Sequence, residues 1–380
     1  MKITRISRAS GVALVAALAL AGCGSSTNSD SSSSNPAAGG SSSGSDSGSG
    51  SGSGSGGAAD CFTGNLKAEG STAQQNAIQQ ASSSYSQKCS GAKISYNGTG
   101  SGAGITAFTN KQVDFAGSDS ALKKDKGEPE KAKQACGSEA WNLPMVTGPI
   151  AVAFNVKGVD KLNLTNELIA KIFSGKITKW NDPAIAKENS GVTLPATNIS
   201  VFFRSDSSGT TDNFTKFMNT TDPTDWPEKN SKTWTGKTGQ GKAKSAGVAQ
   251  AVSGTDGGIG YVEWSYAIQN NLKVSKLNGI DLTADSVGKA VEAATQSGTG
   301  NDLALKLDYK TKAQGAYPLI LVTYEIVCSK YSDPTKAKNV KAFLSYMASP
   351  EFQGTLTKIG SAPLPQSIQQ KVATAVNAIS

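Results

Sequence analysis

The segment "RSDSSGTTDNF", residues 204–214, contains residue types that could do chemistry. One arginine precedes a run of serine and threonine hydroxyls, a glycine and an aspartate. An arginine can donate to two oxygens of one oxyanion, and hydroxyls can donate further hydrogen bonds. The segment could therefore bind an anion without changing it, or it could supply a serine nucleophile.

Three other segments share one pattern with it, because a predicted strand ends in a glycine beside a hydroxyl residue. They are "AEGSTAQQ" from residue 68, "NGTGSGAGITAF" from residue 97 and "VDFAGSDSAL" from residue 113. The N–H groups at a helix start are free and bind oxyanions, and glycine allows close backbone approach. Taken singly, a serine or threonine there is an ordinary helix cap. Four such turns in one chain, one with an arginine and one with an aspartate, favour an oxyanion site.

Catalysis is disfavoured by composition, because the chain contains no histidine. This excludes Ser-His-Asp and Cys-His systems and removes the commonest transition-metal ligand, although carboxylate, lysine or metal–oxygen chemistry stays possible. The segment "GKTGQGKA" from Gly236 fits the spacing of a phosphate-binding loop, but Ala243 stands where magnesium needs a hydroxyl. We therefore predict a polar surface loop there, with no metal and no cofactor.

The elements that must position these turns are short β-type runs that alternate with helical patterns. The segment from Thr165 to Gly175 is typical of the helices, with a capping hydroxyl, an apolar stripe and a terminal glycine. Such alternation predicts an α/β fold with largely parallel sheets. Residues 61–380 exceed what one core usually holds, so two lobes are expected. The segments "VTGPIAVAFN" and "GAYPLILVTY" could be two hinge crossings. Glycine and proline that only mark the end of a strand explain them equally well.

The N-terminal region is predicted to be a leader and a tether. Residues 1–22 combine basic residues with a short apolar core, as in a signal peptide, and "LAGC" resembles the bacterial lipobox, in which Cys23 is lipidated. Residues 23–60 are rich in serine and glycine, which predicts a flexible tether. Without Lys2, Arg5 and Arg8 of the leader, 34 basic residues stand against 29 acidic ones, a net charge of +5. This charge is mild, and no dense basic run suggests nucleic-acid binding. We expect a protein anchored by lipid to the outer face of a bacterial cell membrane.

Four cysteines remain in the folded part, and an oxidising compartment favours two disulfides. Three pairings are possible. A strand at 65–69 that leads into a helix at 72–88 would bring the end of the helix back to the start of the strand. We therefore predict the pair Cys61–Cys89, which leaves Cys136–Cys328.

Six motifs in order resemble one family: "AEGST", "YNGTGSGAGI", "VDFAGSD", "IFSGKITKWNDPAI", "RSDSSGT" and "IGYVE". They resemble the phosphate-binding lipoprotein of bacterial ABC phosphate importers, over nearly the whole folded part. The resemblance implies a two-lobed periplasmic-binding-protein fold of type II, with two hinge crossings and a ligand cleft between the lobes. It favours residues 61–147 plus 317–380 as lobe I and 148–316 as lobe II.

The resemblance also implies the ligand set. Ala73 stands where many relatives have a larger apolar residue, and its N–H contact survives that change. Asp206 is implied to pair with Arg204 and to hold its guanidinium in place. The implied phosphate ligands are Thr72, Ala73, Ser101, Asp119, Arg204, Ser208, Gly209 and Thr210.

Asp119 has a specific use beside an anion. Phosphate at neutral pH still carries a proton that it can donate to a carboxylate, whereas sulfate carries none. A site that requires one hydrogen bond can reject an analogue lacking it by roughly 10⁴–10⁵-fold. Asp119 is then an acceptor that selects phosphate, and the alternative is an aspartate that caps a turn. For Arg204 the alternative is a surface ion pair.

The predicted function is capture of inorganic phosphate outside the cytoplasm and delivery to an ABC-type permease, by a monomer that is not an enzyme. Alternatives are the same fold selecting sulfate or molybdate, an exported phosphoesterase with Ser208 as nucleophile, and a sensor or adhesin that keeps the fold. Two further motifs are weaker as sites. The segment around Trp180 is expected to shape the second lobe, and Glu263 either lines the closure surface or belongs to a core strand.

Overall fold

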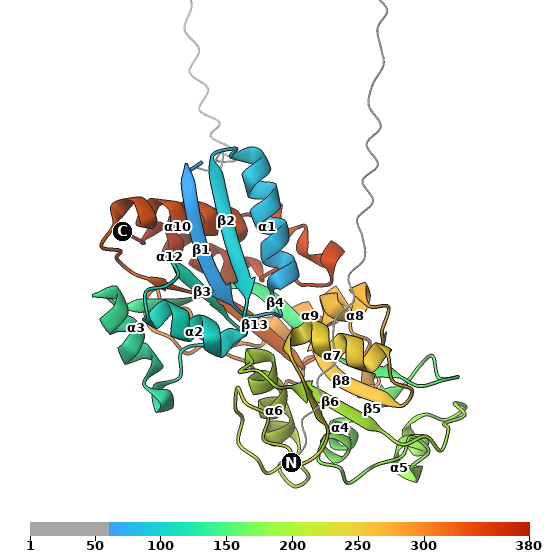
Figure 1. The fold of residues 1–380 in the computed structure, drawn as a ribbon. Coiled ribbons are helices and arrows are strands. Elements are labelled where there is room, and N and C mark those ends of the chain that lie inside the picture. The colour runs from blue at the N-terminus through green and yellow to red at the C-terminus, as the bar shows by residue number, and fades with distance from the viewer. Residues whose placement is uncertain (1–60) are drawn as a thin grey trace, which may run out of the picture. The chain divides into compact units, whose positions relative to one another are not determined.

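The computed structural model describes residues 61–380 (Figure 1). The predicted signal peptide, the lipidation site Cys23 and the predicted tether lie outside the described residues. Within the described range, no helix combines the length and the apolar character needed to cross a membrane.

Thirteen strands and twelve α-helices are found between residues 61 and 380, in the alternation that the sequence predicts. The strands are β1 (Gly64–Gly70), β2 (Ala92–Gly98), β3 (Phe115–Ser118), β4 (Ala140–Asn155), β5 (Asn163–Leu164), β6 (Ser200–Arg204), β7 (Gln240–Lys242), β8 (Gly258–Glu263), β9 (Lys273–Val274), β10 (Lys276–Leu277), β11 (Thr295–Gln296), β12 (Leu305–Lys306) and β13 (Ile320–Cys328). The α-helices are α1 (Gln75–Lys88), α2 (Ser101–Thr109), α3 (Glu128–Cys136), α4 (Asn166–Phe173), α5 (Pro183–Glu188), α6 (Gly209–Thr221), α7 (Lys244–Ser253), α8 (Trp264–Gln269), α9 (Ala284–Glu292), α10 (Pro334–Ala348), α11 (Pro350–Gln353) and α12 (Gln366–Asn377), and the 3₁₀ turns are η1 (Lys124–Lys126) and η2 (Leu356–Ile359).

The main sheet is mixed, so the expectation of largely parallel sheets is only partly correct. Its strand order is β2-β1-β3-β13-β4-β8-β6-β7, and β9 pairs with β4. The pairs β1–β2, β1–β3, β6–β8 and β6–β7 are parallel. The pairs of β13 with β3 and β4, and of β4 with β8, are antiparallel. Each of these antiparallel pairs includes β4 or β13, which run through the middle of the sheet in opposite directions.

Strand β4 changes partner in its middle, and this divides the sheet into two halves. Residues 140–149 pair with β13, whereas residues 150–155 pair with β8. The change falls at Pro149 and Ile150, two residues after the expected end of the first part of lobe I. We propose the boundaries given by the sequence, with residues 61–147 and 317–380 in lobe I and residues 148–316 in lobe II.

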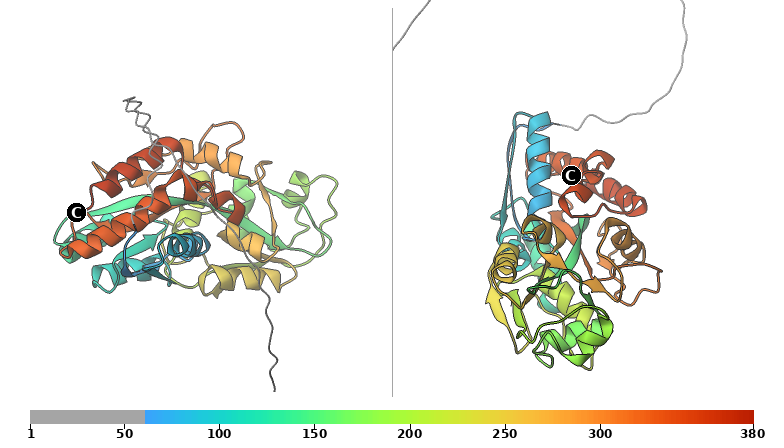
Figure 2. Two further views of the ribbon diagram at one scale, coloured as in Figure 1. Left: turned by 90° about the horizontal axis from the view of Figure 1, so that it is seen from above. Right: turned by 90° about the vertical axis from the view of Figure 1, so that its right-hand side faces the viewer.

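Helices cover both faces of each half of the sheet. In lobe I, α1, α10 and α12 share one apolar core with β1 and β4, and α10 and α12 lie side by side (Figure 2). The opposite face packs against α2 and α3. In lobe II, Ile150, Val152 and Phe154 of β4 face α4 and α6, while Ala151 and Ala153 face α7 and α8. Alternate residues therefore serve two cores, as the two-residue period of a strand requires.

Two local expectations in lobe II agree with the structure. The Thr165 side chain accepts a hydrogen bond from the Leu168 N–H and so begins α4, and Gly175 follows its end with a φ of 80°. Trp180 is fully buried, packs against Phe154 and donates its ring N–H to the Gly257 carbonyl at 3.0 Å. This indole shapes the core of the second lobe, as expected.

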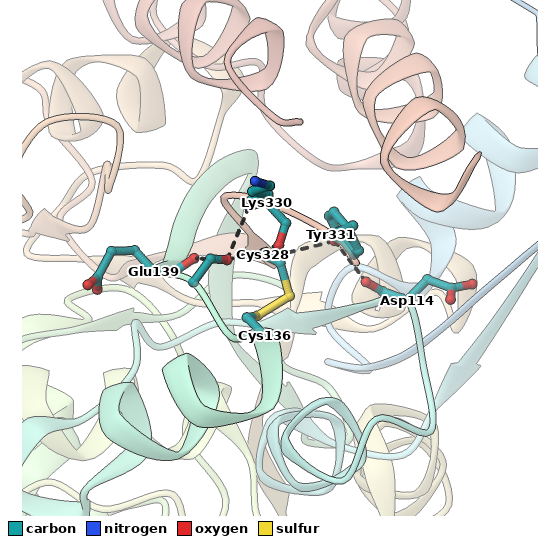
Figure 3. Close-up of a disulfide and its surroundings, with 7 residues drawn as sticks. Asp114, Cys136, Glu139, Cys328, Lys330 and Tyr331 are labelled. Carbon is teal, nitrogen blue, oxygen red and sulfur yellow. Dashed lines mark hydrogen bonds between the residues drawn. A yellow bond between two sulfur atoms is a disulfide. The ribbon is translucent and has the colours of Figure 1, made fainter. Parts of the chain in front are cut away.

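Both predicted disulfides are present among the described cysteines. Cys61 and Cys89 have Cα atoms 5.3 Å apart, and Cys136 and Cys328 have Cα atoms 5.4 Å apart. The second disulfide joins the end of α3 to the end of β13 (Figure 3). Beside it, the Tyr331 hydroxyl donates to the Asp114 carbonyl at 2.9 Å and accepts the Cys328 N–H at 3.4 Å. This cross-link fastens the C-terminal segment of lobe I to its N-terminal segment.

We expect the two disulfides to stabilise the fold unequally, because they close loops of different length. The sequence separations are 192 residues for Cys136–Cys328 and 28 for Cys61–Cys89. Loss of chain entropy in the unfolded state predicts about 5 kcal/mol for the longer loop and about 3.5 kcal/mol for the shorter one. Urea unfolding of the two double serine variants measures this difference. A larger loss in the Cys61→Ser/Cys89→Ser variant would contradict the loop-length argument.

Candidate functional site

Four helices of the described chain begin around one place, and hydrogen bonds join the turns that lead into them. The Gly209 N–H at the start of α6 donates to Ser101 Oγ at the start of α2, at 3.1 Å. The Ser245 N–H in the first turn of α7 approaches Thr72 Oγ1, ahead of α1, at 3.3 Å. The partial positive charges of these helix starts are therefore directed at a common region.

One expected turn differs from the sequence prediction. The turn that carries Asp119 ends β3, but no helix starts directly after it, and the chain continues to the short turn η1. Helix α7 contributes the fourth helix start instead. Asp119 consequently projects a carboxylate among donors that other elements supply.

Hydroxyls surround the Asp119 carboxylate on both oxygens. Oδ1 accepts hydrogen bonds from Ser71 Oγ and, at 2.9 Å, from Thr323 Oγ1. Oδ2 accepts from Thr210 Oγ1 at 3.2 Å and from Ser101 Oγ at 3.5 Å. Burial raises the pKa of Asp119, and the hydroxyls together with the Arg204 charge oppose that rise. The carboxylate is thus a buried acceptor held by donors from several elements.

Arg204 is held in place by Asp206. The guanidinium donates from Nε to Asp206 Oδ1 at 2.8 Å and from Nη2 to Oδ2. Asp206 also accepts the Lys244 N–H at 2.9 Å. Burial alone would raise the pKa of Asp206, but its hydrogen bonds with Arg204 and the charge of that residue lower it. Arg204 is only 2% exposed, which excludes the surface ion pair considered above.

The remaining expected ligands lie in the same network. The Ser208 side chain accepts the Thr211 N–H at 3.2 Å and so caps α6. The Ala73 N–H donates to Ser71 Oγ at 3.0 Å. The seven non-glycine residues of the expected set are each at most 3% exposed; they are Thr72, Ala73, Ser101, Asp119, Arg204, Ser208 and Thr210.

Three hydroxyl residues of the network were missed by the sequence analysis. Ser71 and Thr323 donate to Asp119. Ser245 Oγ lies 2.8 Å from Thr72 Oγ1 and accepts a hydrogen bond from Arg204 Nη1 at 3.2 Å. Thr323 could have been noticed as a hydroxyl within an otherwise apolar strand. Ser245 lies two residues after the segment dismissed as a phosphate-binding loop, and the apolar repeat after it signals a helix start.

The network can bind a small oxyanion, because it contains hydroxyls, backbone N–H groups and one guanidinium, all shielded from water. Thr72 and Arg204 meet at Ser245, and Ser101 and Thr210 meet at Asp119. The structure thus brings residues 72, 101, 119 and 204 together. A buried anion requires such donors to replace its water shell.

Gly209 has to be a glycine for these contacts to form. A Cβ atom there would lie 2.6 Å from Asp119 Cβ and 2.7 Å from Ser101 Oγ. Glycine is therefore required even though it lies in a helix. We expect Gly209→Ala to lower the free energy of unfolding by roughly 1–3 kcal/mol through overpacking. Gly247→Ala is the matched control, since a Cβ in that turn of α7 has its nearest neighbour at 3.6 Å. Chemical denaturation that gives equal stabilities for both variants would contradict the requirement.

Two further carboxyls are buried behind this network without a cation. Burial raises the pKa of Glu263 and the pKa of Glu325 to about 8 each. Glu263 accepts from Ser361 Oγ at 3.0 Å and from the Ser265 N–H at 2.9 Å. Glu325 has no ion pair among the described residues, and its interaction with the Gln74 side chain only partly opposes the rise of its pKa.

Glu325 makes stability depend on pH. Its pKa of about 8 lies above the ordinary value of 4.5. Between these values the folded state holds a proton that the unfolded state has lost, so the free energy of unfolding falls as pH rises, by about 1.4 kcal/mol per pH unit. Glu325→Gln removes this dependence.

We therefore expect the melting temperature of Glu325→Gln, relative to the unchanged chain, to increase from pH 5 to pH 8.5. Differential scanning calorimetry at several pH values measures it. Glu188→Gln, at an exposed carboxyl, is the control. A constant difference between Glu325→Gln and the unchanged chain would show that Glu325 is already ionised in the folded state at pH 5.

Solved structures share this architecture. A periplasmic phosphate-binding protein bound with phosphate (PfluDING) aligns with a TM-score of 0.69 and 23% identity, covering 82% of this chain and 93% of that one. A phosphate-binding protein from Stenotrophomonas maltophilia aligns with a TM-score of 0.67 and 21% identity, covering 82% and 94%. A sequence profile for the PBP superfamily domain matches residues 32–351. The chain is a two-lobed protein of the PBP superfamily.

Sequence relatives define the family more narrowly. The phosphate-binding protein PstS2 of Mycobacterium bovis is 46% identical over 323 residues, which are 83% of this chain and 87% of that protein. The phosphate-binding protein PstS of Xylella fastidiosa is 32% identical over 306 residues, which are 78% of this chain and 80% of that protein. The chain belongs to the family of phosphate-binding proteins named PstS.

Proposed function

We propose that this chain captures inorganic phosphate outside the cytoplasm and delivers it to an ABC-type membrane permease. The observation that carries the proposal is the buried Asp119 carboxylate among hydroxyl donors, with a buried arginine in the same network. The names of the PstS relatives support it. The expected ligands Thr72, Ala73, Ser101, Asp119, Arg204, Ser208, Gly209 and Thr210, with Asp206 in support, are part of the proposal.

Affinity comes from exchanging water for fixed donors. When phosphate binds, the hydroxyls of Ser101 and Thr210, which donate to Asp119 in the structure, turn to phosphate oxygens. The Thr72 hydroxyl and backbone N–H groups at the helix starts donate to the other oxygens. Arg204 supplies the positive charge, and Asp206 restricts the orientation of its guanidinium. Charge-assisted hydrogen bonds of this kind are about twice as strong as neutral ones. The donors are ordered before the ion arrives, which lowers the entropic cost of binding.

Selectivity comes from Asp119. Four hydroxyls donate to this carboxylate in the structure, and when those of Ser101 and Thr210 turn to phosphate, Oδ2 becomes free to accept from the ligand. Hydrogen phosphate and dihydrogen phosphate can donate a proton to it. Sulfate at neutral pH has no proton and would place an oxygen lone pair against the carboxylate. Two buried acceptors that face each other without a hydrogen between them cost free energy, and this cost lowers the affinity for sulfate.

Closure of the lobes completes the site. Asp119 and Ser101 lie in lobe I of the proposed division, and Gly209, Thr210 and Asn213 lie in lobe II. The Asn213 amide donates to the Asp119 carbonyl at 2.7 Å, beside the bonds from Thr210 and Gly209. An ion that takes donors from both lobes favours the closed form over the open one.

The cellular setting belongs to the same proposal. A lipid on Cys23 would hold the protein at the outer face of the cell membrane, and residues 24–60 would allow it to reach the permease. We propose that it acts as a monomer, without a cofactor and without nucleic acid. The absence of histidine and the ligand-holding role of the Ser208 segment favour a binding protein over a phosphoesterase.

We expect Asp119→Asn to weaken the discrimination between phosphate and sulfate. The amide can donate to sulfate, so the ratio of the two dissociation constants should fall by roughly 10²-fold or more. Isothermal titration calorimetry of the full-length chain with phosphate, sulfate and arsenate measures it. Asp125→Asn, at an exposed carboxyl, is the matched control. Unchanged selectivity in Asp119→Asn would remove this role for Asp119, and tight sulfate binding by the unchanged chain would contradict the proposed ligand.

A further inference from the structure

A cavity of about 180 Å³ lies next to the proposed phosphate site. One water occupies roughly 30 Å³ of liquid, so the cavity has room for an oxyanion together with some of its water shell. Its lining combines polar and charged side chains with an apolar wall formed by Leu305, Leu307 and Val322. Asp119 and Asn213 line it as well, and these two residues therefore separate the cavity from the inner network.

The only acidic side chain in this lining besides Asp119 is already engaged. Asp212 forms an ion pair with Lys123 at 2.5 Å. Its carboxylate also accepts hydrogen bonds from Ser120 Oγ at 2.7 Å and from Asn230 Nδ2 at 2.6 Å. Asp212 and Lys123 thus neutralise one another at the wall.

Lys216 is the cation that this arrangement leaves over. It lies on α6, lines the cavity and is half-buried, and within residues 61–380 it has no ion pair and no side-chain hydrogen bond. Burial lowers the pKa of Lys216, and repulsion by Lys123 and Lys306 lowers it further, while Asp212 opposes the effect. The lining holds as many carboxylates as lysines, but Asp212 is paired with Lys123 and Asp119 accepts from the hydroxyls of the inner network, so Lys216 is the charge in this lining that lacks a fixed partner.

The position of the cavity relates it to entry into the inner site. The wall between them is made by Asp119 from lobe I and Asn213 from lobe II, joined by the 2.7 Å hydrogen bond described above. Asn213 is fixed from the other side, because Tyr309 donates to its amide oxygen at 2.7 Å. A separation of the proposed lobes would break this hydrogen bond and would connect the cavity with the inner ligands.

We propose that this cavity is an outer anion site, in which Lys216 holds a hydrated oxyanion before it enters the inner site. The proposal rests on the proposed function, since the anion that passes inward is phosphate. A charge at the rim of a binding site acts mainly on the association rate and its salt dependence, whereas contacts inside the site determine dissociation. A lysine that merely covers apolar surface with its stem would affect neither.

The test is stopped-flow tryptophan fluorescence of the full-length chain with inorganic phosphate, at several potassium chloride concentrations. We expect Lys216→Gln to lower the association rate constant by roughly three- to tenfold at low salt, with the difference fading at high salt. The dissociation rate constant should stay unchanged. Lys338→Gln, which changes an exposed lysine on α10 that does not line the cavity, should behave like the unchanged chain.

The possible outcomes separate the two proposals. If the unchanged chain binds phosphate and Lys216→Gln associates equally fast with the same salt dependence, the outer site is refuted and the proposed function stands. Faster dissociation at every salt concentration would also refute it, because it would place Lys216 in the inner site. If the unchanged chain does not bind phosphate, the proposed function fails, and the outer site for phosphate fails with it.

Discussion

A carboxylate buried beside an anion site is the constraint on which the rest of this structure depends. Asp119 is 3% exposed, and an isolated charge there would be costly. The chain meets this cost with hydroxyls from the turn before α1, from α2, from α6 and from β13. These donors come from both lobes, so the same hydrogen bonds that stabilise the carboxylate also bring the lobes together. Closure and selectivity therefore share one set of contacts.

The charged side chains around Asp119 are arranged so that few unpaired charges face the anion site. Arg204 is neutralised by Asp206, and Lys123 is neutralised by Asp212, so the buried cations have fixed partners. Glu263 and Glu325 have no ion pair among the described residues, and burial raises the pKa of each to about 8. This rise favours the neutral form of both groups. The anion therefore meets dipoles and one guanidinium, with few ionised carboxylates opposing it.

The folded scaffold makes this convergence possible by passing strand β4 through both halves of the sheet. Strand β4 pairs with β13 over one part and with β8 over the other. Thr323 sits on β13, and the turn before α8 carries Glu263, which accepts from Ser361 in the C-terminal segment. Residues more than 90 positions apart in the chain thereby touch the same region. A change in the angle between the proposed lobes would act on the Glu263–Ser361 contact, whereas Thr323 and Asp119 lie in the same lobe.

Short-range patterns in the sequence determined much of the local structure of this protein. The alternation of strands and helices, the caps of α4 and α6 and the Cys61–Cys89 disulfide follow from short-range patterns, because each depends on neighbouring residues or on one strand–helix return. The Cys136–Cys328 disulfide joins residues 192 positions apart and follows from the sequence only as the remaining pair. Only the tertiary structure decided that β4 and β13 are antiparallel, that α7 brings Ser245 to Thr72 and Arg204, and that Lys216 lines a cavity beside Asp119. These facts depend on pairing between distant segments, and a serine or lysine at a helix start has the same local pattern wherever its helix packs.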